Sequence, residues 1–254
     1  RGIRQGWMLA LCFVACHKAP RATLPGPVHA TVTGEAMGGQ LRIIVRCDDV
    51  DDHAEALAAA LAARGEIARI EALATDWRPE GEVARLNAAA GGPATAISPE
   101  VEELLRRSLA LARATDGAFD PTIGALWGLW DFEGHRAADP LALAERLPLV
   151  GWERVELAPG AARLPELGMA LTLGGIAQGY AAQRALAIVP PRWEALVDVS
   201  GDIAVRGKWT IEIQDPVGPR GQSVGSLVLE DAVLTTSGDY ERGFSLGDRW
   251  VHHI

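Results

Sequence analysis

The sequence is poor in lysine and in cysteine, and each scarcity excludes a class of protein. Lys18 and Lys208 are the only lysines, and 33 acidic residues against 24 basic ones give a net charge of −9. Nonspecific nucleic-acid binding needs a basic face that releases counterions, so this composition argues against that class. The three cysteines, Cys12, Cys16 and Cys47, have no metal-like spacing to a second cluster.

The remaining composition is typical of a folded globular protein. Hydrophobic residues make up 48% of the 254 residues and charged residues 22%. A chain of this length can bury a sizeable core, as one large domain or two small ones. No repeat or low-complexity segment is visible, and we expect one principal domain over 31–254.

The first sixteen residues resemble a bacterial export signal. Arg1 and Arg4 precede an apolar run over 7–15, and Ala15 stands directly before Cys16, as at a lipoprotein cleavage site. The run is too short to span a bilayer, which takes roughly 20 apolar residues. We expect a signal segment over 1–16 with a lipid on Cys16, and a linker over 17–30. Plain secretion and a frayed or buried N-terminal helix are the alternatives.

Sequence periodicity predicts an α+β fold with mixed or antiparallel sheets packed against helices. Helices are expected over 51–74, 98–114, 139–147 and 176–189, from apolar spacing and from the N-cap pairs Ser98-Pro99 and Asp139-Pro140. Strands are expected at 28–32, 41–45, 170–173, 195–199, 209–213, 226–229, 233–236 and 249–252. Strands and helices do not alternate strictly, which disfavours a doubly wound sheet.

A glycine pair joins an expected strand to an expected helix in LTLGGIAQGYAAQ (171–183). Gly174 and Gly175 let the backbone approach a ligand closely, and free N–H groups of the first helical turn attract anions. The segment is therefore suited to phosphate binding. The alternative is a tight turn whose glycines serve packing alone.

Asp120 lies directly before a proline in TDGAFDPTIGALWGLWDF (115–132). The proline biases it away from helical backbone, so Asp120 and the ring of Phe119 are expected in an extended loop that can contact a ligand. The alternative is an Asx-Pro turn that caps the next segment. Trp127 and Trp130 are expected in the core.

Five further segments complete a set with a fixed order along the chain. They are EAMGG (35–39), TDWRPEGEVARLN (75–87), VDVSGDIAVRG (197–207), TTSGDYERG (235–243) and HHI (252–254). Each alone is compatible with an ordinary turn or core segment. In this order, the whole set resembles the FAD:protein FMN transferase (ApbE-like) family, and Ala118-Phe119-Asp120 is the closest match.

The glycine-pair segment shows both the resemblance and its departures. The family pattern is approximately D-x-G-G/A-I-A-K-G-Y-A-x-D, and positions 174–177 and 179–181 match it. Thr172, Gln178 and Gln183 replace the first aspartate, the lysine and the last aspartate. The amide of Gln178 keeps hydrogen-bond donors but no charge, so a flavin pocket is expected with altered affinity. Elsewhere, Gly39 replaces a threonine after Met37, and Gly81 replaces a helix-capping serine.

The resemblance implies transfer of FMN from FAD to a threonine or serine of an acceptor protein, with release of AMP. It implies His253 as the catalytic base, with the neighbouring His252, on the opposite face of an expected strand, as the alternative. It also implies the carbonyl of Gly175 as a Mg²⁺ ligand, and a flavinylated subunit of a membrane redox complex as the acceptor. The signal segment over 1–16 predicts export to the periplasmic side of a bacterial membrane. The residues that the resemblance places around FAD are Met37, Trp77, Ala118, Phe119, Asp120, Thr172, Gln178 and Ile254.

Two other functions fit the same residues. A hydrolase would split FAD into FMN and AMP with water as the acceptor, and a degenerate binding module would hold FAD without chemistry. The resemblance also implies further Mg²⁺ ligands in an aspartate- and threonine-containing segment beyond HHI. We therefore expect the domain over 31–254 to be C-terminally incomplete for metal binding.

Overall fold

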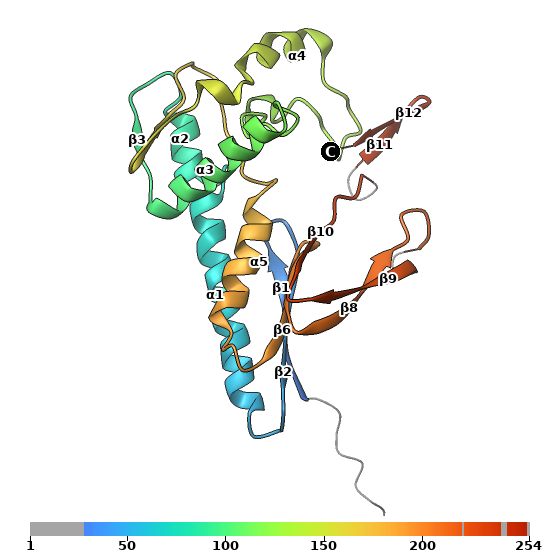
Figure 1. Ribbon diagram of the computed structural model, residues 1–254. Helices are drawn as coiled ribbons and strands as arrows, with labels where there is room; N and C mark the ends of the chain where they lie inside the picture. The colour runs from blue at the N-terminus through green and yellow to red at the C-terminus, as the bar shows by residue number, and fades with distance from the viewer. Residues whose placement is uncertain (1–27, 220, 240–242, 253–254) are drawn as a thin grey trace, which may run out of the picture.

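A five-stranded antiparallel sheet stands at the centre of the computed structural model, which describes residues 28–219, 221–239 and 243–252 (Figure 1). The strand order is β1-β2-β6-β7-β10, and each neighbouring pair is antiparallel. The strands are β1 (Val28–Ala36), β2 (Gly39–Cys47), β6 (Glu194–Val199), β7 (Asp202–Arg206) and β10 (Val233–Thr235). β1 already includes the last three residues of the expected linker.

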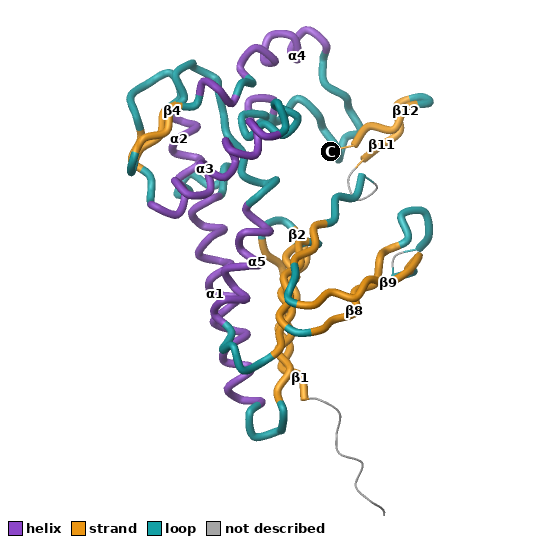
Figure 2. The backbone as a smooth tube through the Cα atoms, viewed as in Figure 1, coloured by secondary structure: helices purple, strands orange, loops and turns teal. Residues whose placement is uncertain are grey.

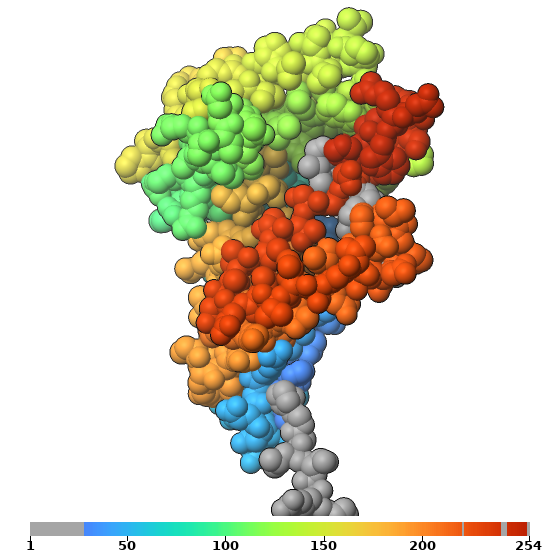
Figure 3. Space-filling model, turned by 45° about the vertical axis from the view of Figure 1, so that its right-hand side comes forward, coloured from blue at the N-terminus to red at the C-terminus, as the bar shows by residue number. Residues whose placement is uncertain are grey.

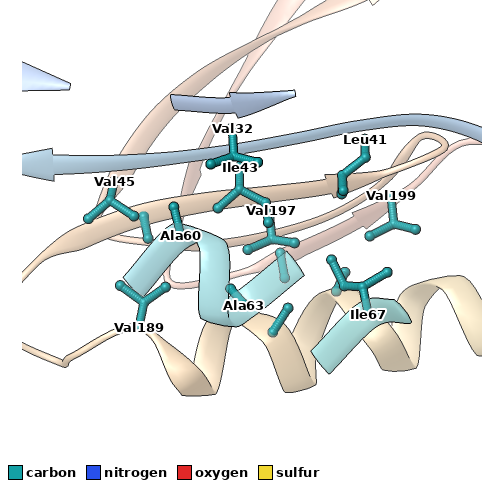
Figure 4. Packing of buried hydrophobic residues seen from close by; sticks show 14 of the residues in the cluster. Val32, Leu41, Ile43, Val45, Ala60, Ala63, Ile67, Val189, Val197 and Val199 are labelled. Atoms are coloured by element: carbon teal, nitrogen blue, oxygen red, sulfur yellow. The ribbon is translucent and has the colours of Figure 1, made fainter. Parts of the chain in front are cut away.

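Two helices, α1 (His53–Ala74) and α5 (Ala177–Ile188), cover one face of this sheet (Figure 1). Both turn small residues toward the core, and such residues let helices lie close to each other and to a sheet. The strands supply branched side chains, so that a layer of valine and isoleucine meets a layer of alanine (Figure 4). The alanines buried on the helices are Ala56, Ala60 and Ala63 on α1 and Ala181, Ala182 and Ala185 on α5.

A second core lies beyond the end of α1 and contains most of the remaining helices (Figure 2). It is built around the fully buried Leu86, Leu104 and Leu105. A small sheet, ordered β3-β5-β4, covers it. The elements here are α2 (Glu82–Ala88), β3 (Thr95–Ala96), α3 (Pro99–Ala114), β4 (Glu156–Ala158) and β5 (Ala161–Arg163), with α4 (Pro140–Arg146) further out. Short 3₁₀ turns lie at η1 (Gly124–Leu126), η2 (Leu147–Leu149) and η3 (Trp152–Arg154).

Two hairpins complete the described chain. β8 (Lys208–Gln214) and β9 (Ser223–Glu230) pair with each other, and Trp209 and Ile211 join Leu196 and Ile203 in a third core cluster. Leu196 alternates along β6 with Ala195 and Val197 of the first core, so this cluster lies on the opposite face of the sheet. β11 (Gly243–Leu246) and β12 (Arg249–His252) form the second hairpin, near the loop that leads to α4 (Figure 3). There Phe244 stacks on His135 with ring centroids 5.6 Å apart.

The α+β fold expected from the sequence is confirmed, and local signals placed several helices to within two residues. Ser98 caps α3 by accepting a hydrogen bond from the N–H of Val101, and Asp139 caps α4 through Leu141. The strand expected over 170–173 is wrong: that segment makes one isolated parallel bridge, between Ala170 and Ile123. The strands β3, β4, β5, β7 and β11 were not expected. No helix in the described part of the chain has both the length and the apolar character to cross a membrane.

A charge network ties three helices together between the two cores. Arg69 on α1 donates hydrogen bonds to Glu66 and, across the helix interface, to Glu100 on α3. The hydroxyl of Tyr180 on α5 donates to the same Glu100, at 3.2 Å. The hydrogen bonds from Arg69 hold the pKa of Glu66 and the pKa of Glu100 below their ordinary values.

Because of this network, we expect Arg69→Met to lower the free energy of unfolding by an amount that depends on pH. A carboxyl whose pKa is lowered by folding stabilises the protein above its unfolded pKa and loses that stabilisation as the pH falls through the folded pKa. The variant should lose about 1 kcal/mol of unfolding free energy at pH 7, a figure that allows for solvent around the half-exposed guanidinium. The difference should shrink between about pH 5 and pH 3. Urea titrations at several pH values measure it. Arg64→Met, which changes an exposed arginine of the same helix, is the control. A difference between Arg69→Met and wild type that is unchanged at pH 3 would contradict the assignment.

Candidate functional site

A cavity of about 50 Å³ lies where the end of α1, the β1–β2 turn and the start of α5 meet. It brings together Met37, Trp77 and Gln178, three of the residues that the resemblance places around FAD, from three distant parts of the chain. The lining residues are Met37, Glu71, Ala74, Thr75, Asp76, Trp77, Leu173, Gly174, Ala177 and Gln178. Ala118, Phe119, Asp120 and Thr172 are not among them.

Met37 lies in the tight turn between β1 and β2. Ala36 pairs with Gly39, so the turn consists of Met37 and Gly38, with φ of 53° and 85°. Both residues have the left-handed conformation of a type I′ turn, which glycine adopts freely and methionine does not. The carbonyl of Met37 accepts a hydrogen bond from Nε2 of Gln178 at 3.1 Å. The neutral Gln178 thus joins this turn to α5 and positions Met37 at the cavity.

Gly39 replaces the family's threonine for a visible steric reason. Ser200, with φ of 57°, occupies the neighbouring turn between β6 and β7, and its hydroxyl donates to the carbonyl of Ala36 at 3.3 Å. A Cβ on Gly39 would lie 2.4 Å from the Oγ of Ser200. The two turns therefore pack against each other only with glycine at 39.

Trp77 follows the end of α1 and is 63% exposed. The guanidinium of Arg78 lies 5.9 Å from the centre of the indole and forms an ion pair with Glu71 at 3.0 Å. Most of the indole is thus open to a planar ligand. Gly81, expected to weaken a helix cap, is instead required here, because a Cβ would lie 2.3 Å from the carbonyl oxygen of Thr75.

Asp120 organises its own loop. One carboxylate oxygen accepts from the backbone and hydroxyl of the buried Thr122, at 2.8 and 2.6 Å, and the other from the N–H of Trp152 at 3.2 Å. The hydroxyl of Thr122 in turn accepts from the N–H of Gly151 at 2.7 Å. Asp120 therefore forms the Asx turn that was the alternative to a ligand-binding loop. A contact between Asp120 and FAD stays a prediction.

The Asp120 loop lies beside the glycine-pair segment. The N–H of Thr172 donates to the carbonyl of Pro121 at 2.8 Å, and a Cβ on Gly175 would lie 2.9 Å from the ring of Phe119. Gly175 therefore makes room for Phe119, as the packing alternative requires, whereas Gly174 lines the cavity. Trp127, expected in the core, is 60% exposed, because the segment around it turns outward after η1.

The start of α5 offers fewer free N–H groups than the sequence indicates. The N–H groups of Ile176 and Ala177 both donate to the carbonyl of Leu173, at 3.0 and 2.8 Å, and that of Gly174 to the hydroxyl of Thr172 at 3.3 Å. These three N–H groups are therefore already paired within the turn, and phosphate binding there stays a prediction.

Asp202 lies against the first turn of α5. Burial raises the pKa of Asp202, and hydrogen bonds with Thr235 and with the N–H of Gly179 partly offset that effect. The side chain caps the first turn of α5 and is not among the residues that line the cavity. Its carboxylate occupies part of the electropositive helix end.

The described residues do not by themselves form a magnesium site. Within 28–219, 221–239 and 243–252, no group of three or more His, Cys, Asp or Glu side chains could hold a metal. The carbonyl of Gly175 supplies one neutral oxygen, whereas Mg²⁺ requires near-octahedral oxygen coordination, usually with a carboxylate. His253, Ile254 and Cys16 lie outside the described residues.

Sequence reasoning missed three polar members of the cavity: Glu71, Thr75 and Asp76. Glu71 and Thr75 are four residues apart at the end of α1, a spacing that puts two side chains on one helix face. This spacing indicates that Glu71 and Thr75 share one surface of the helix. The position of Asp76 depends on how the chain leaves α1, and the sequence carries no clear signal for it.

The fold and the cavity define an α+β protein with a cavity between a hairpin turn and two helices. Within that class the chain belongs to the ApbE family, whose model matches residues 37–254. The resemblance identified from the sequence is thereby confirmed.

The curated relatives are longer than this chain. An FAD:protein FMN transferase of Treponema pallidum is 33% identical over 193 residues, covering 66% of this chain and 53% of the relative. One from Klebsiella pneumoniae is 35% identical over 175 residues, covering 66% and 55%. The chain thus spans about half the length of these curated relatives.

Solved structures share the fold. An ApbE protein from Thermotoga maritima superposes with a TM-score of 0.79 at 26% identity, covering 89% of this chain and 75% of that protein. A flavin transferase ApbE from Vibrio cholerae gives 0.69 at 20% identity, covering 84% and 72%. The second likeness is evidence for the fold alone.

Proposed function

We propose that this chain is part of a transferase that moves FMN from FAD to a threonine or serine hydroxyl of an acceptor protein. The acceptor oxygen would attack the phosphorus of the FMN half of FAD. The bond from that phosphorus to the bridging diphosphate oxygen would break, AMP would leave, and the hydroxyl proton would pass to a base. The single observation that carries the proposal is the cavity that brings together Met37, Trp77 and Gln178 in a chain of this family.

The described residues have separate roles in this proposal. Trp77 stacks against the flavin, Met37 and Gln178 close the cavity, and Thr172 orders the turn through Gly174. Asp120 holds the loop that presents Ala118 and Phe119 beside the glycine pair. His253 as the base and Ile254 as a further FAD contact come from the resemblance alone.

Magnesium, export and the lipid anchor also belong to this proposal. Mg²⁺ would neutralise the diphosphate when bound, with the carbonyl of Gly175 as one ligand and the others elsewhere in the protein. A signal segment ending at Cys16 supports a lipid-anchored enzyme on the periplasmic side of a bacterial membrane. The acceptor would be a flavinylated subunit of a membrane redox complex. Mass spectrometry of the membrane fraction tests the anchor by looking for an acylated N-terminal Cys16.

A single incubation experiment distinguishes the three candidate functions, which are transferase, hydrolase and binding module. The full-length protein is mixed with FAD, Mg²⁺ and a redox-subunit domain that a curated relative flavinylates in parallel. A mass increase of one FMN on the acceptor, with an equal amount of AMP, is the expected result. Free FMN and AMP without acceptor labelling would favour the hydrolase. Intact FAD bound to the protein would favour the binding module.

Charge at position 178 should control the affinity for FAD. A lysine there can still donate to the carbonyl of Met37 and adds a positive charge beside the proposed diphosphate position. Gln178→Lys should therefore tighten FAD binding about tenfold in a fluorescence titration at low salt. Gln178→Met is the neutral control and should weaken binding. Equal or poorer affinity in the lysine variant would mean that the cavity is built for a neutral side chain.

A further inference from the structure

We infer that Thr75 and Asp76 form a polar subsite that hydrogen-bonds the edge of a heteroaromatic ring lying on Trp77. The inference rests on the proposed function, because it identifies residues that would recognise part of FAD. Neither residue is among those that the family resemblance places around FAD. Both line the cavity, together with Trp77.

The first observation is a pair of polar atoms without partners. Oγ1 of Thr75 and Oδ2 of Asp76 are both buried, and neither has a hydrogen-bond partner among the residues that the structure describes. Thr75 as a whole is 2% exposed. Buried polar atoms in folded proteins nearly always have partners, because an unpaired one is costly. Two such atoms, on adjacent residues of one cavity, indicate that a ligand supplies their missing hydrogen-bond partners.

The second observation is that contacts within the protein fix the backbone and the methyl group of Thr75. Its N–H donates to the carbonyl of Glu71 at 3.0 Å, and its carbonyl accepts from the N–H of Ala84 at 3.2 Å. The methyl group faces Gly81, where a Cβ would lie 2.5 Å from it. The backbone and methyl group are thus fixed by protein contacts, and the hydroxyl is the only part of the side chain left for a ligand.

The third observation concerns the charges around Asp76. Arg78, the nearest arginine in sequence, forms an ion pair with Glu71 and lies over Trp77. It therefore neutralises Glu71 and leaves Oδ2 of Asp76 unpaired. A carboxylate only accepts hydrogen bonds, whereas a threonine hydroxyl can both donate and accept.

These atoms fit a ring edge that carries an N–H next to an acceptor. The N–H would donate a hydrogen bond to Asp76, and the neighbouring acceptor would accept one from the Thr75 hydroxyl. Two parts of FAD present such an edge: the imide of the flavin, with its flanking carbonyls, and the amine of adenine, with its flanking ring nitrogen. The edge would enter the cavity, and the rest of the ring would lie against the exposed Trp77.

The test compares FMN and AMP as separate ligands of the full-length protein. Asp76→Asn should weaken binding of one of them about tenfold, since it removes a charge-assisted acceptor. Thr75→Val should weaken binding of the same ligand by about fivefold, and Thr75→Ser, which keeps the hydroxyl, by less than about twofold. A loss confined to FMN would assign the flavin edge, and a loss confined to AMP the adenine edge. For the flavin edge, 3-methyl-FMN should bind wild type about as weakly as FMN binds Asp76→Asn.

A stability measurement distinguishes this role from a structural one. If the Thr75 hydroxyl is unpaired without ligand, Thr75→Val should raise the melting temperature of the ligand-free protein by about 2–4 °C. A hydroxyl with a structural hydrogen bond would give the opposite sign. If wild type binds FAD and both variants bind FMN and AMP as wild type does, the subsite is refuted while the proposed function stands. If wild type binds none of the three, the proposed function falls as well.

Discussion

Replacing Asp120 by alanine should lower the free energy of unfolding by about 3 kcal/mol and weaken FAD binding at least tenfold. The variant loses the acceptor for three donors: the backbone and hydroxyl of Thr122, and the N–H of Trp152. Thr122 is fully buried, so its donors cannot turn to water. The loop that presents Phe119 beside Gly175 should then lose its fixed position. Urea titration measures the first effect and flavin fluorescence the second.

Asp120→Asn and Asp116→Asn are the matched controls for this prediction. The first keeps one amide oxygen as an acceptor for Thr122 and should lose about half as much stability. The second changes an exposed aspartate of the same loop whose left-handed backbone, with φ of 51°, asparagine tolerates. A destabilisation below about 1 kcal/mol in Asp120→Ala would show that the loop is held by other contacts.

Replacing Trp77 by alanine should reduce FAD affinity roughly thirtyfold while leaving the stability of the free protein almost unchanged. Stacking of a planar ring on an aromatic side chain contributes about 2 kcal/mol by alanine substitution in comparable sites. The indole is 63% exposed, so its removal creates no buried cavity in the free protein. Calorimetric titration with FAD gives the affinity, and thermal unfolding gives the stability.

Trp127→Ala is the matched control for the indole. Trp127 is exposed to a similar extent, 60%, and does not line the cavity. It should therefore bind FAD as wild type does. Equal losses in the two variants would mean that the flavin does not lie against Trp77 in particular.

The sequence predicted those elements whose signals are local. Ser98 and Asp139 cap their helices through the N–H groups of Val101 and Leu141, two or three residues away. Such contacts depend on a few neighbouring residues, and the proline after each cap reinforces them. The helix over α1 followed equally from the spacing of its own apolar residues.

The cavity could be predicted only in part, because it depends on contacts between distant segments. Met37 and Gln178 are 141 positions apart, and their hydrogen bond exists only once α5 lies against the β1–β2 turn. The family resemblance placed both residues around FAD but did not place Thr75 or Asp76 there, although they begin the segment over 75–87. The pattern at 170–173 is typical of a strand. In the structure this segment lies beside the Asp120 loop and bridges to it at one position, between Ala170 and Ile123. Steric reasons for Gly39 and Gly81 likewise appear only when Ser200 and Thr75 are in place.

A structure of the full-length protein with bound FAD would test the central claim most directly. We expect the flavin or adenine ring to lie on Trp77, with one edge in the cavity lined by Met37, Thr75, Asp76 and Gln178. The diphosphate should then lie along 174–178, beside the ring of Phe119. FAD found elsewhere on the molecule, with this cavity unchanged, would contradict the account.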